Sequence, residues 1–164
     1  MNVKEKHIFY MSKALELANI AKKNGDVPVG AIIVHNNQII GSGYNMVEKL
    51  NNPLAHAEIL AINDAVKKIG YKHLFDTKMF VTLEPCSQCG GAIVLARIPE
   101  IFIGAKDPKS GACGSVENIV QNEKLNHQCK VEFGILEKEC SVILKSFFKN
   151  LRLRNKINNT KKYA

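Results

Sequence analysis

Two short stretches decide how this chain is organised: PLAHAE at positions 53–58 and TLEPCSQC at positions 82–89. The first supplies the imidazole of His56 and, two residues further on, the carboxylate of Glu58. The second supplies two thiols at the spacing of neighbouring metal ligands. One nitrogen and two sulfur atoms form a ligand set that Zn²⁺ prefers. A structural zinc site normally has four protein ligands, so three predict a catalytic site with one position open for water.

Both stretches are predicted to lie at helix N-termini. Apolar spacing predicts a helix over 56–70, and Pro85 ends a strand so that Cys86 opens another helix. The positive end of a helix dipole lowers the pKa of a thiol, which favours binding of Cys86 and Cys89 as thiolates. With these ligands assigned, Glu58 is the base available to take a proton from water and return it to the substrate.

The remaining periodicity predicts the element order αββαβαβ(α)βα. About 26 residues separate the last two strands, a length that allows a crossover and therefore parallel pairing. The order predicts an α/β fold, a three-layer α/β/α sandwich around a mixed five-stranded sheet. Besides the helices at 56–70 and from Cys86, the predicted elements are a helix at 4–24, strands at 29–34, 38–43, 79–83, 101–104 and 131–135, a helix-like piece at 116–123 and a helix from Glu137.

Composition predicts a single cytoplasmic domain. The chain has 164 residues, of which 46% are hydrophobic and 23% charged, as in ordinary globular proteins. No apolar run approaches transmembrane length, so no membrane association is expected, and the N-terminus does not read as a signal peptide. Five cysteines, an odd number, do not indicate a secreted disulfide framework. Three of them have no ligand partner at a useful spacing and are expected to pack as small apolar residues: Cys113, Cys129 and Cys140.

The positive charge is concentrated at the C-terminus. Of the net charge of +8, seven charges come from basic residues after Ser141, a stretch with no acid, so the first 140 residues carry only +1. We therefore divide the chain into a domain at 1–150 and a basic tail at 151–164, which is either a helix extension or flexible. Such a run is either a solvated face or an arm that binds phosphates.

Five segments, one of which overlaps the second ligand stretch, extend the pattern: VPVGA at 27–31, GYN at 43–45, VTLEPC at 81–86, GAKDPKSGACGS at 104–115 and FF at 147–148. With the His-Ala-Glu triplet, they resemble the bacterial tRNA-specific adenosine deaminases of the cytidine deaminase superfamily over nearly the whole chain. The resemblance implies a cytidine-deaminase-like fold, a homodimer and one zinc ion per subunit. It also implies conversion of the wobble adenosine in a tRNA anticodon stem-loop to inosine.

The resemblance also implies roles for individual residues. His56, Cys86 and Cys89 would hold zinc, while Glu58 would move protons. Asn45 would touch the flipped base or its ribose. The other residues expected to bind the substrate are Pro28 and Val29 in the pocket wall, Asp107 and Lys109 in the anticodon-loop groove, and Ala57, Phe147, Lys149 and Arg152.

Two alternatives stay open on the sequence. A deaminase of a free base or nucleoside, such as guanine or cytosine, shares the metal chemistry, although a small neutral substrate does not need an acid-free basic tail. The second alternative is a zinc-stabilised RNA-binding module without catalysis. Such a module would not explain the presence of Glu58 or the open position in the zinc ligand set.

Overall fold

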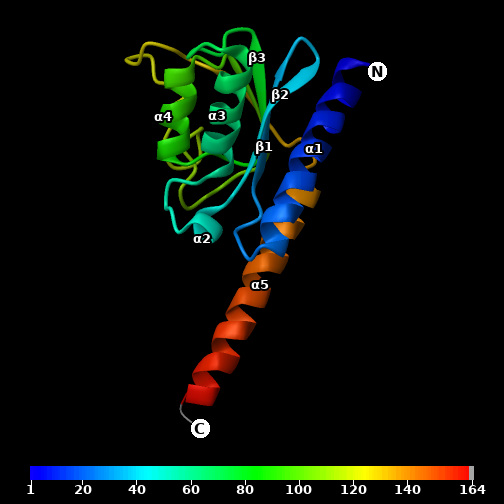
Figure 1. Cartoon of the computed structure of the whole chain (residues 1–164), viewed down its shortest axis with the longest axis vertical. Coiled ribbons are helices and arrows are strands. Elements are labelled where there is room, and N and C mark those ends of the chain that lie inside the picture. Colours follow the sequence, from blue (N-terminus) through cyan, green and yellow to red (C-terminus); the bar gives the residue numbers. More distant parts are fainter. Residues whose placement is uncertain (163–164) are drawn as a thin grey trace.

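The computed structural model describes residues 1–162, which form a three-layer α/β/α sandwich (Figure 1). A five-stranded sheet with the order β2-β1-β3-β4-β5 lies between two helical layers. The helices are α1 (Val3–Lys23), α2 (Val47–Leu50), α3 (Ala57–Ile69), α4 (Ser87–Ala96) and α5 (Glu137–Lys162), and the strands are β1 (Gly30–His35), β2 (Gln38–Tyr44), β3 (Thr77–Leu83), β4 (Glu100–Ala105) and β5 (Lys130–Phe133).

The sheet is mixed, as the sequence predicted. β1 pairs antiparallel with β2 and with β3, whereas β3, β4 and β5 are parallel to one another. The β1–β2 hairpin turns at Asn36 and Asn37, which have φ values of 49° and 61°. Two positive φ values are the geometry of a type I′ turn, for which asparagine is well suited.

Successive side chains of each strand point to opposite sides of the sheet, and both sides are apolar. Ile32, Phe80 and Phe102 point toward α1 and α5, and the two phenylalanine rings stack at 4.7 Å between centroids. Ile33 and Val81 point to the opposite face, where α3 packs on β1 and β2 and α4 packs beside α3. The core is therefore divided between the two layers, and each layer depends on one face of the same strands.

Glycines in β2 bring α3 close to the sheet. A Cβ atom added at Gly41 would overlap the carbonyl oxygen of Ala61, and one at Gly43 would overlap that of Ala57. The strand register shifts in this hairpin, and the close neighbour of both glycines is the helix α3. This contact fixes the N-terminal end of α3 against the sheet.

One local prediction was wrong, and one short helix was not predicted. Residues 116–123 form turns and a short bridge between Cys113 and Asn118, and no helix. The N–H groups of Glu117 and Ile119 bond to the carbonyl oxygens of Gly111 and Ala112, so the backbone is satisfied without helical bonds. The four-residue helix α2 was not predicted, because it is too short to show periodicity.

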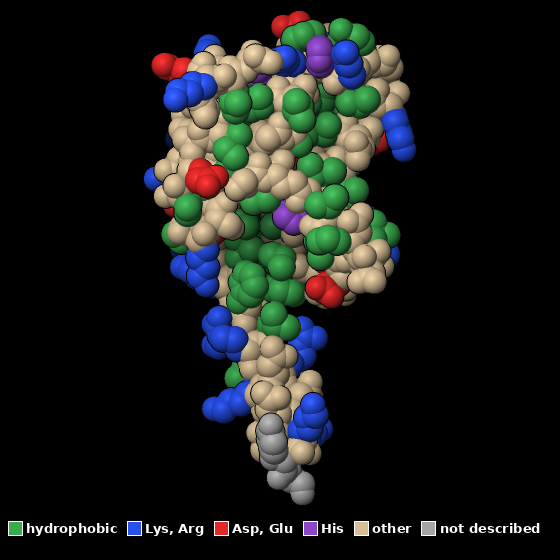
Figure 2. Space-filling model, turned by 90° about the vertical axis from the view of Figure 1, so that its left-hand side faces the viewer, with side chains coloured by type: hydrophobic (Ala, Val, Ile, Leu, Met, Phe, Trp, Pro, Cys, Tyr) green, Lys and Arg blue, Asp and Glu red, His purple; other side chains and the backbone are tan. Residues whose placement is uncertain are grey.

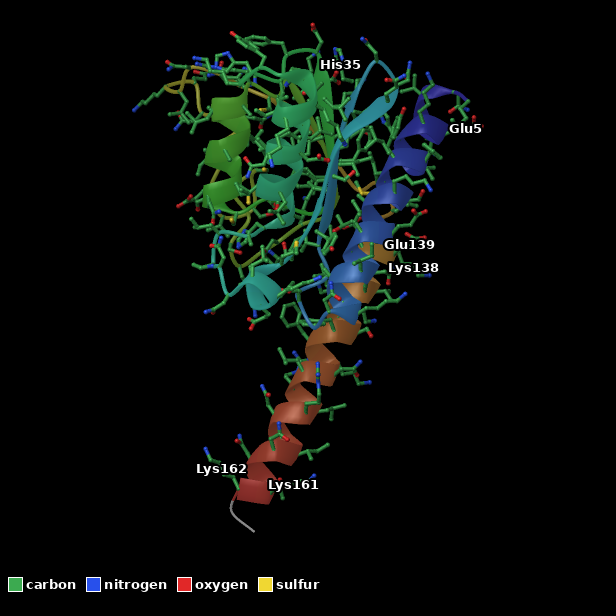
Figure 3. The ribbon with its side chains drawn as sticks, viewed as in Figure 1. Glu5, His35, Lys138, Glu139, Lys161 and Lys162 are labelled. Atoms are coloured by element: carbon green, nitrogen blue, oxygen red, sulfur yellow. The ribbon has the colours of Figure 1, made fainter. Side chains whose placement is uncertain are left out.

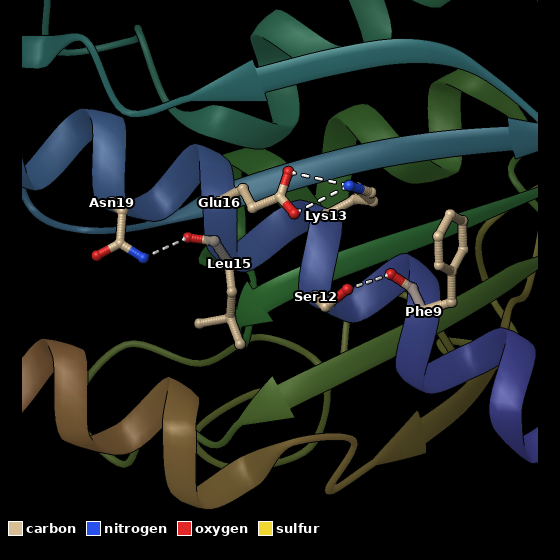
Figure 4. Close-up of polar contacts among 6 residues, drawn as sticks. All are labelled: Phe9, Ser12, Lys13, Leu15, Glu16 and Asn19. Carbon is tan, nitrogen blue, oxygen red and sulfur yellow. Dashed lines mark hydrogen bonds and ion pairs between the residues drawn. The ribbon is translucent and has the colours of Figure 1, made fainter.

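The outward side of α1 is satisfied by contacts within the helix (Figure 4). Lys13 pairs with both oxygens of Glu16 at 2.9 and 3.2 Å, and the Asn19 side chain donates to the carbonyl of Leu15. Such exposed pairs contribute only about 0.2–0.5 kcal/mol each. Packing of the buried side of α1 on the sheet must therefore hold the helix in place.

The helix α5 begins in the core and continues beyond it (Figure 1). Cys140, Ile143, Leu144 and Phe147 are buried, whereas every residue from Arg152 to Lys162 is exposed. The segment expected as a basic tail therefore continues α5 as a helix to Lys162, and its last two residues lie outside the described part. No helix within residues 1–162 is long and apolar enough to cross a membrane.

Candidate active site

Three possible metal ligands meet where α3 and α4 begin. His56 is the N-cap residue of α3 and Cys86 the N-cap residue of α4, with Cys89 in the first turn of the latter. The Nδ1 atom of His56 lies 3.5 Å from the sulfur atom of each cysteine. All three ligand atoms lie within 4.8 Å of one another. Both ligand stretches thus lie at helix N-termini, as the sequence predicted.

The spacing of these atoms fits zinc. Tetrahedral zinc with bonds of about 2.05 Å to nitrogen and 2.3 Å to sulfur separates such ligands by about 3.6 Å. The separations of 3.5 Å between the His56 nitrogen and the two sulfur atoms match this value. Two sulfurs and one nitrogen also suit zinc chemically and leave one tetrahedral position for a non-protein ligand.

The two sulfur atoms behave as a coupled pair. A hydrogen bond from Cys89, together with one from His56, lowers the pKa of the Cys86 thiol to about 4. The same contact with Cys86, followed by burial, raises the pKa of Cys89. Two adjacent thiolates repel one another unless a cation lies between them. This donor pair therefore needs a metal ion or a shared proton.

Glu58 has the properties expected of a proton carrier. Its side chain is only 4% exposed and lies in the first turn of α3 beside the ligands. Burial raises the pKa of this carboxyl to about 7, because the charged form loses its hydration. A group with a pKa near neutrality both accepts and releases a proton readily. Burial thus distinguishes Glu58 from a solvent-exposed acid at a helix start.

A cavity of about 640 Å³ opens over these residues. His56, Glu58 and Cys86 form part of its lining. Among the residues expected to bind substrate, the structure brings Val29, Asn45, Asp107 and Phe147 into the lining. The volume exceeds what a single purine base needs, and its open side leaves room for a longer substrate.

Other residues expected to bind substrate do not line the cavity. Pro28 and Ala57 are buried beside it, and Lys109 is exposed on the neighbouring loop. Lys149 and Arg152 are exposed on α5 but belong to another side of that helix than Phe147. The backbone N–H of Ala57 donates to the Oδ1 atom of Asn45 at 2.9 Å. Ala57 therefore contributes by holding a cavity residue in place.

The cavity includes residues that sequence reasoning missed. Leu151 and Arg154 line it together with Phe147, at positions four and seven residues after that phenylalanine. If the tail is taken to be helical, this spacing alone predicts that the three side chains lie on the same side of the helix. Asp26 also lines the cavity, and its two oxygens accept from the N–H groups of Glu48 and Lys49 at 2.9 and 3.3 Å. Nothing in the sequence predicted this contact, because α2 was not foreseen.

Glu84 connects the metal-ligand segment to the loop that follows β4. One oxygen accepts from the N–H groups of Cys113 and Ser115 at 3.1 and 3.0 Å, and the other accepts from Asp107 at 2.9 Å and from the Ser115 hydroxyl. A Cβ atom at Gly111 would overlap this carboxylate. These contacts join the end of β3, next to Cys86, to the backbone of that loop.

The remaining cysteines are not part of the site. Cys113, Cys129 and Cys140 are buried, and burial raises the pKa of each thiol. They pack as small apolar residues, as predicted.

The space-filling view of the α4 side shows how the cavity relates to α5 (Figure 2). Apolar side chains gather in a hollow of the domain, directly above the part of α5 that projects from it. Lys and Arg side chains lie on either side of that projecting part. The site therefore combines a buried reactive centre with an exposed basic extension.

The fold and the site are those of the deaminases. The family model for MafB19-like deaminase matches residues 5–152. A solved structure from biochemical and structural studies of A-to-I editing by tRNA:A34 deaminases at the wobble position superposes with a TM-score of 0.80. It is 37% identical and covers 83% of this chain and 99% of that one. Guanine deaminase from Bacillus subtilis, also 37% identical, superposes with a TM-score of 0.58 over 65% of this chain and 66% of that one.

Curated relatives narrow this class further. The tRNA-specific adenosine deaminase of Bacillus subtilis (strain 168) is 43% identical over 147 residues, which is 90% of this chain and 91% of that protein. The tRNA-specific adenosine deaminase of Aquifex aeolicus (strain VF5) is 45% identical over 144 residues, 88% of this chain and 95% of that protein. The chain belongs to the family of tRNA-specific adenosine deaminases.

Proposed function

We propose that this chain deaminates the wobble adenosine of a tRNA anticodon loop. Water replaces the exocyclic amine of adenosine, which gives inosine and ammonia. The observation that carries the proposal is a buried carboxylate, Glu58, beside a His/Cys/Cys cluster at the base of an open cavity. The solved deaminase structure and the curated relatives support adenosine in tRNA as the substrate.

One zinc ion per subunit would be held by His56, Cys86 and Cys89. When bound there, zinc supplies Lewis acidity that activates water. Glu58 accepts a proton from this water and delivers a proton to the purine ring nitrogen next to the reacting carbon. The water oxygen bonds to that carbon, and Glu58 takes the second proton from this oxygen and passes it to the amine. The carbon–nitrogen bond then breaks, so the nitrogen leaves as ammonia and the carbon keeps the oxygen as the carbonyl of inosine. The buried position of Glu58 beside the ligands supports this role.

Substrate binding divides between fixed polar groups and apolar walls. The Oδ1 atom of Asn45 is occupied by the N–H of Ala57, so the amide NH₂ is the part left to donate to the base or ribose. Val29 and Phe147 offer apolar surface for a base taken out of its stack. Asp107 lines the cavity and also accepts from the N–H of Lys109 at 3.0 Å, so its loop is ordered beside the substrate.

We also infer a homodimer, which the family resemblance implies. The outward side of α4 supports it, since Leu95 is 76% exposed on this otherwise apolar helix. A Leu95→Lys variant should shift the sedimentation coefficient toward that of a monomer, whereas Leu153→Lys on the projecting part of α5 should not.

Because tRNA is the substrate, we place the reaction in the cytoplasm.

The test compares substrates that share the reactive ring. The protein is incubated with a synthetic anticodon stem-loop carrying adenosine at the wobble position, and separately with free adenosine, cytidine and guanine. Ammonia and the deaminated product are measured for each. We expect rapid conversion of the stem-loop and little of the small molecules, because the loop supplies binding contacts that a free base lacks. Equal or faster conversion of guanine would replace this proposal by the small-molecule alternative.

A further inference from the structure

Two rows of side chains run along opposite sides of α5. The cavity row lines the cavity and consists of Phe147, Leu151 and Arg154. The outer row is entirely basic and consists of Lys145, Lys149, Arg152 and Lys156. Each of the first three outer residues precedes a cavity residue by two positions, which is a rotation of about 200° around an α-helix. The outer row therefore faces away from the cavity.

The fold does not use the outer row. All four side chains are exposed, and none of the ion pairs among residues 1–162 involves a side chain of α5. Like charges three or four residues apart destabilise a helix by about 0.2–0.5 kcal/mol per pair. Four of them in one row thus weaken α5, so helix stability does not explain their presence.

The outer row lies on α5, which extends from the domain beside the cavity. It begins beside the domain and continues along the projecting part of α5, with Lys161 and Lys162 at the far end of the helix (Figure 3). From Leu151 to Lys162 the helix is about 17 Å long at 1.5 Å per residue. The first 140 residues carry a net charge of only +1, so α5 dominates the positive field of the molecule.

We propose that the outer row of α5 is an electrostatic capture surface for the phosphate backbone of RNA. It speeds the arrival of the substrate at the neighbouring cavity without contacting the nucleotides that the cavity holds. A charged surface beside a binding site raises association rates through its long-range field, and salt weakens this effect. The inference rests on the proposed function only in taking RNA as the substrate. In this proposal the outer row attracts the RNA, and the cavity row binds it.

The test reverses two charges at the ends of the outer row. The variant Lys145→Glu/Lys156→Glu lowers the net charge by four, and its new carboxylates can pair with Lys149 and Arg152 one turn away, so the helix should still form. The matched control Lys67→Glu/Lys124→Glu removes the same charge from two exposed lysines, at the C-terminal end of α3 and in the β4–β5 connection. Association of a fluorescent anticodon stem-loop is measured by stopped flow across a salt series, and kcat is measured at saturation.

We expect the outer-row variant to associate roughly tenfold more slowly at low salt, with the difference disappearing near 1 M salt, where the Debye length is about 3 Å. Its kcat and dissociation rate should match wild type, and the control should change association less than twofold. An equal loss in both variants would assign the effect to net charge alone. An unchanged association rate, or a lower kcat, would also overturn the proposal. Absence of inosine from the wild-type reaction would instead refute the proposed function.

Discussion

The two sides of the cavity are built in different ways. On the side of α3 and α4, Glu58, Glu84 and Cys89 are at most 4% exposed, and backbone groups or neighbouring side chains fix them. Of the three α5 residues that line the cavity, only Phe147 is buried, and the residues that follow it extend into solvent on a single helix. Groups that break bonds must be held within fractions of an ångström, whereas groups that attract a polyanion need only be nearby. Changes on the first side should therefore affect chemistry, and changes on the second side should affect binding.

The largest effect is expected from loss of a metal ligand. In Cys89→Ala, the three-ligand set is incomplete, so both bound zinc and activity should fall to background. Elemental analysis of protein purified without added metal should give about one zinc per wild-type chain. Cys129→Ala serves as the control, since this cysteine is also buried but does not belong to the cluster. Full zinc occupancy in Cys89→Ala would refute the assignment of the site.

Glu58→Gln should separate chemistry from binding. The amide cannot carry a proton, so single-turnover deamination should fall by at least about 10²–10⁴-fold. Zinc content and stem-loop affinity should persist, because Glu58 is proposed neither as a ligand nor as an RNA contact. Glu123→Gln, in an exposed loop, is the matched control. A Glu58→Gln protein that keeps a tenth of the wild-type rate would exclude the role of proton carrier.

Glu84→Gln should mainly cost stability. Its carboxylate accepts from three backbone N–H groups and one hydroxyl, and an amide cannot accept on both sides. Each donor left unpaired in this buried site should cost about 1–3 kcal/mol of unfolding free energy. Thermal unfolding measures the loss. Glu117→Gln is the control on the same loop, because this exposed acid accepts only one side-chain bond, from Ser87 at 3.2 Å. Equal Tm values for the two variants would mean that Glu84 does not anchor the loop.

The reactive side of the cavity was readable from sequence because each of its parts has a local signal. His-x-Glu, Cys-x-x-Cys and the helix starts are defined within a few residues. The length of the connection between the last two strands indicated a crossover, and β4 and β5 do pair in parallel. The contacts of Asp26 with α2 join residues 22 positions or more apart and involve backbone groups, which leave no pattern in the sequence. The helix expected at 116–123 failed because apolar spacing does not report which carbonyl accepts each N–H.

The same long-range contact predicts a moderate effect on binding. The helix α2 has no buried residues, and Asp26 accepts from the N–H groups of its second and third residues, Glu48 and Lys49. Asp26→Ala should therefore loosen α2, costing about 1 kcal/mol as for other lost caps. Hydrogen exchange at Glu48 and Lys49 should accelerate, and the KM for the stem-loop should rise severalfold with kcat retained. The control is Asp64→Ala, which removes a similar bond to the N–H of Ser42 outside the cavity. A similar rise in KM for both variants would assign the effect to general destabilisation.

The smallest effect compares single charges on the two sides of α5. Arg154 belongs to the cavity row and Arg152 to the outer row, so Arg154→Gln and Arg152→Gln remove the same charge two residues apart. If Arg154 contacts a phosphate of the bound loop, its loss should reduce the slope of log affinity against log salt by about 0.7. Arg152→Gln should change this slope by less, because its side chain faces away from the bound RNA. Phosphate contacts do not select bases, so both variants should keep the preference for adenosine over other bases at the wobble position. Equilibrium titration of the stem-loop from low to moderate salt gives both slopes. Equal slopes for the two variants would mean that α5 acts as a uniformly charged rod, without two functionally distinct sides.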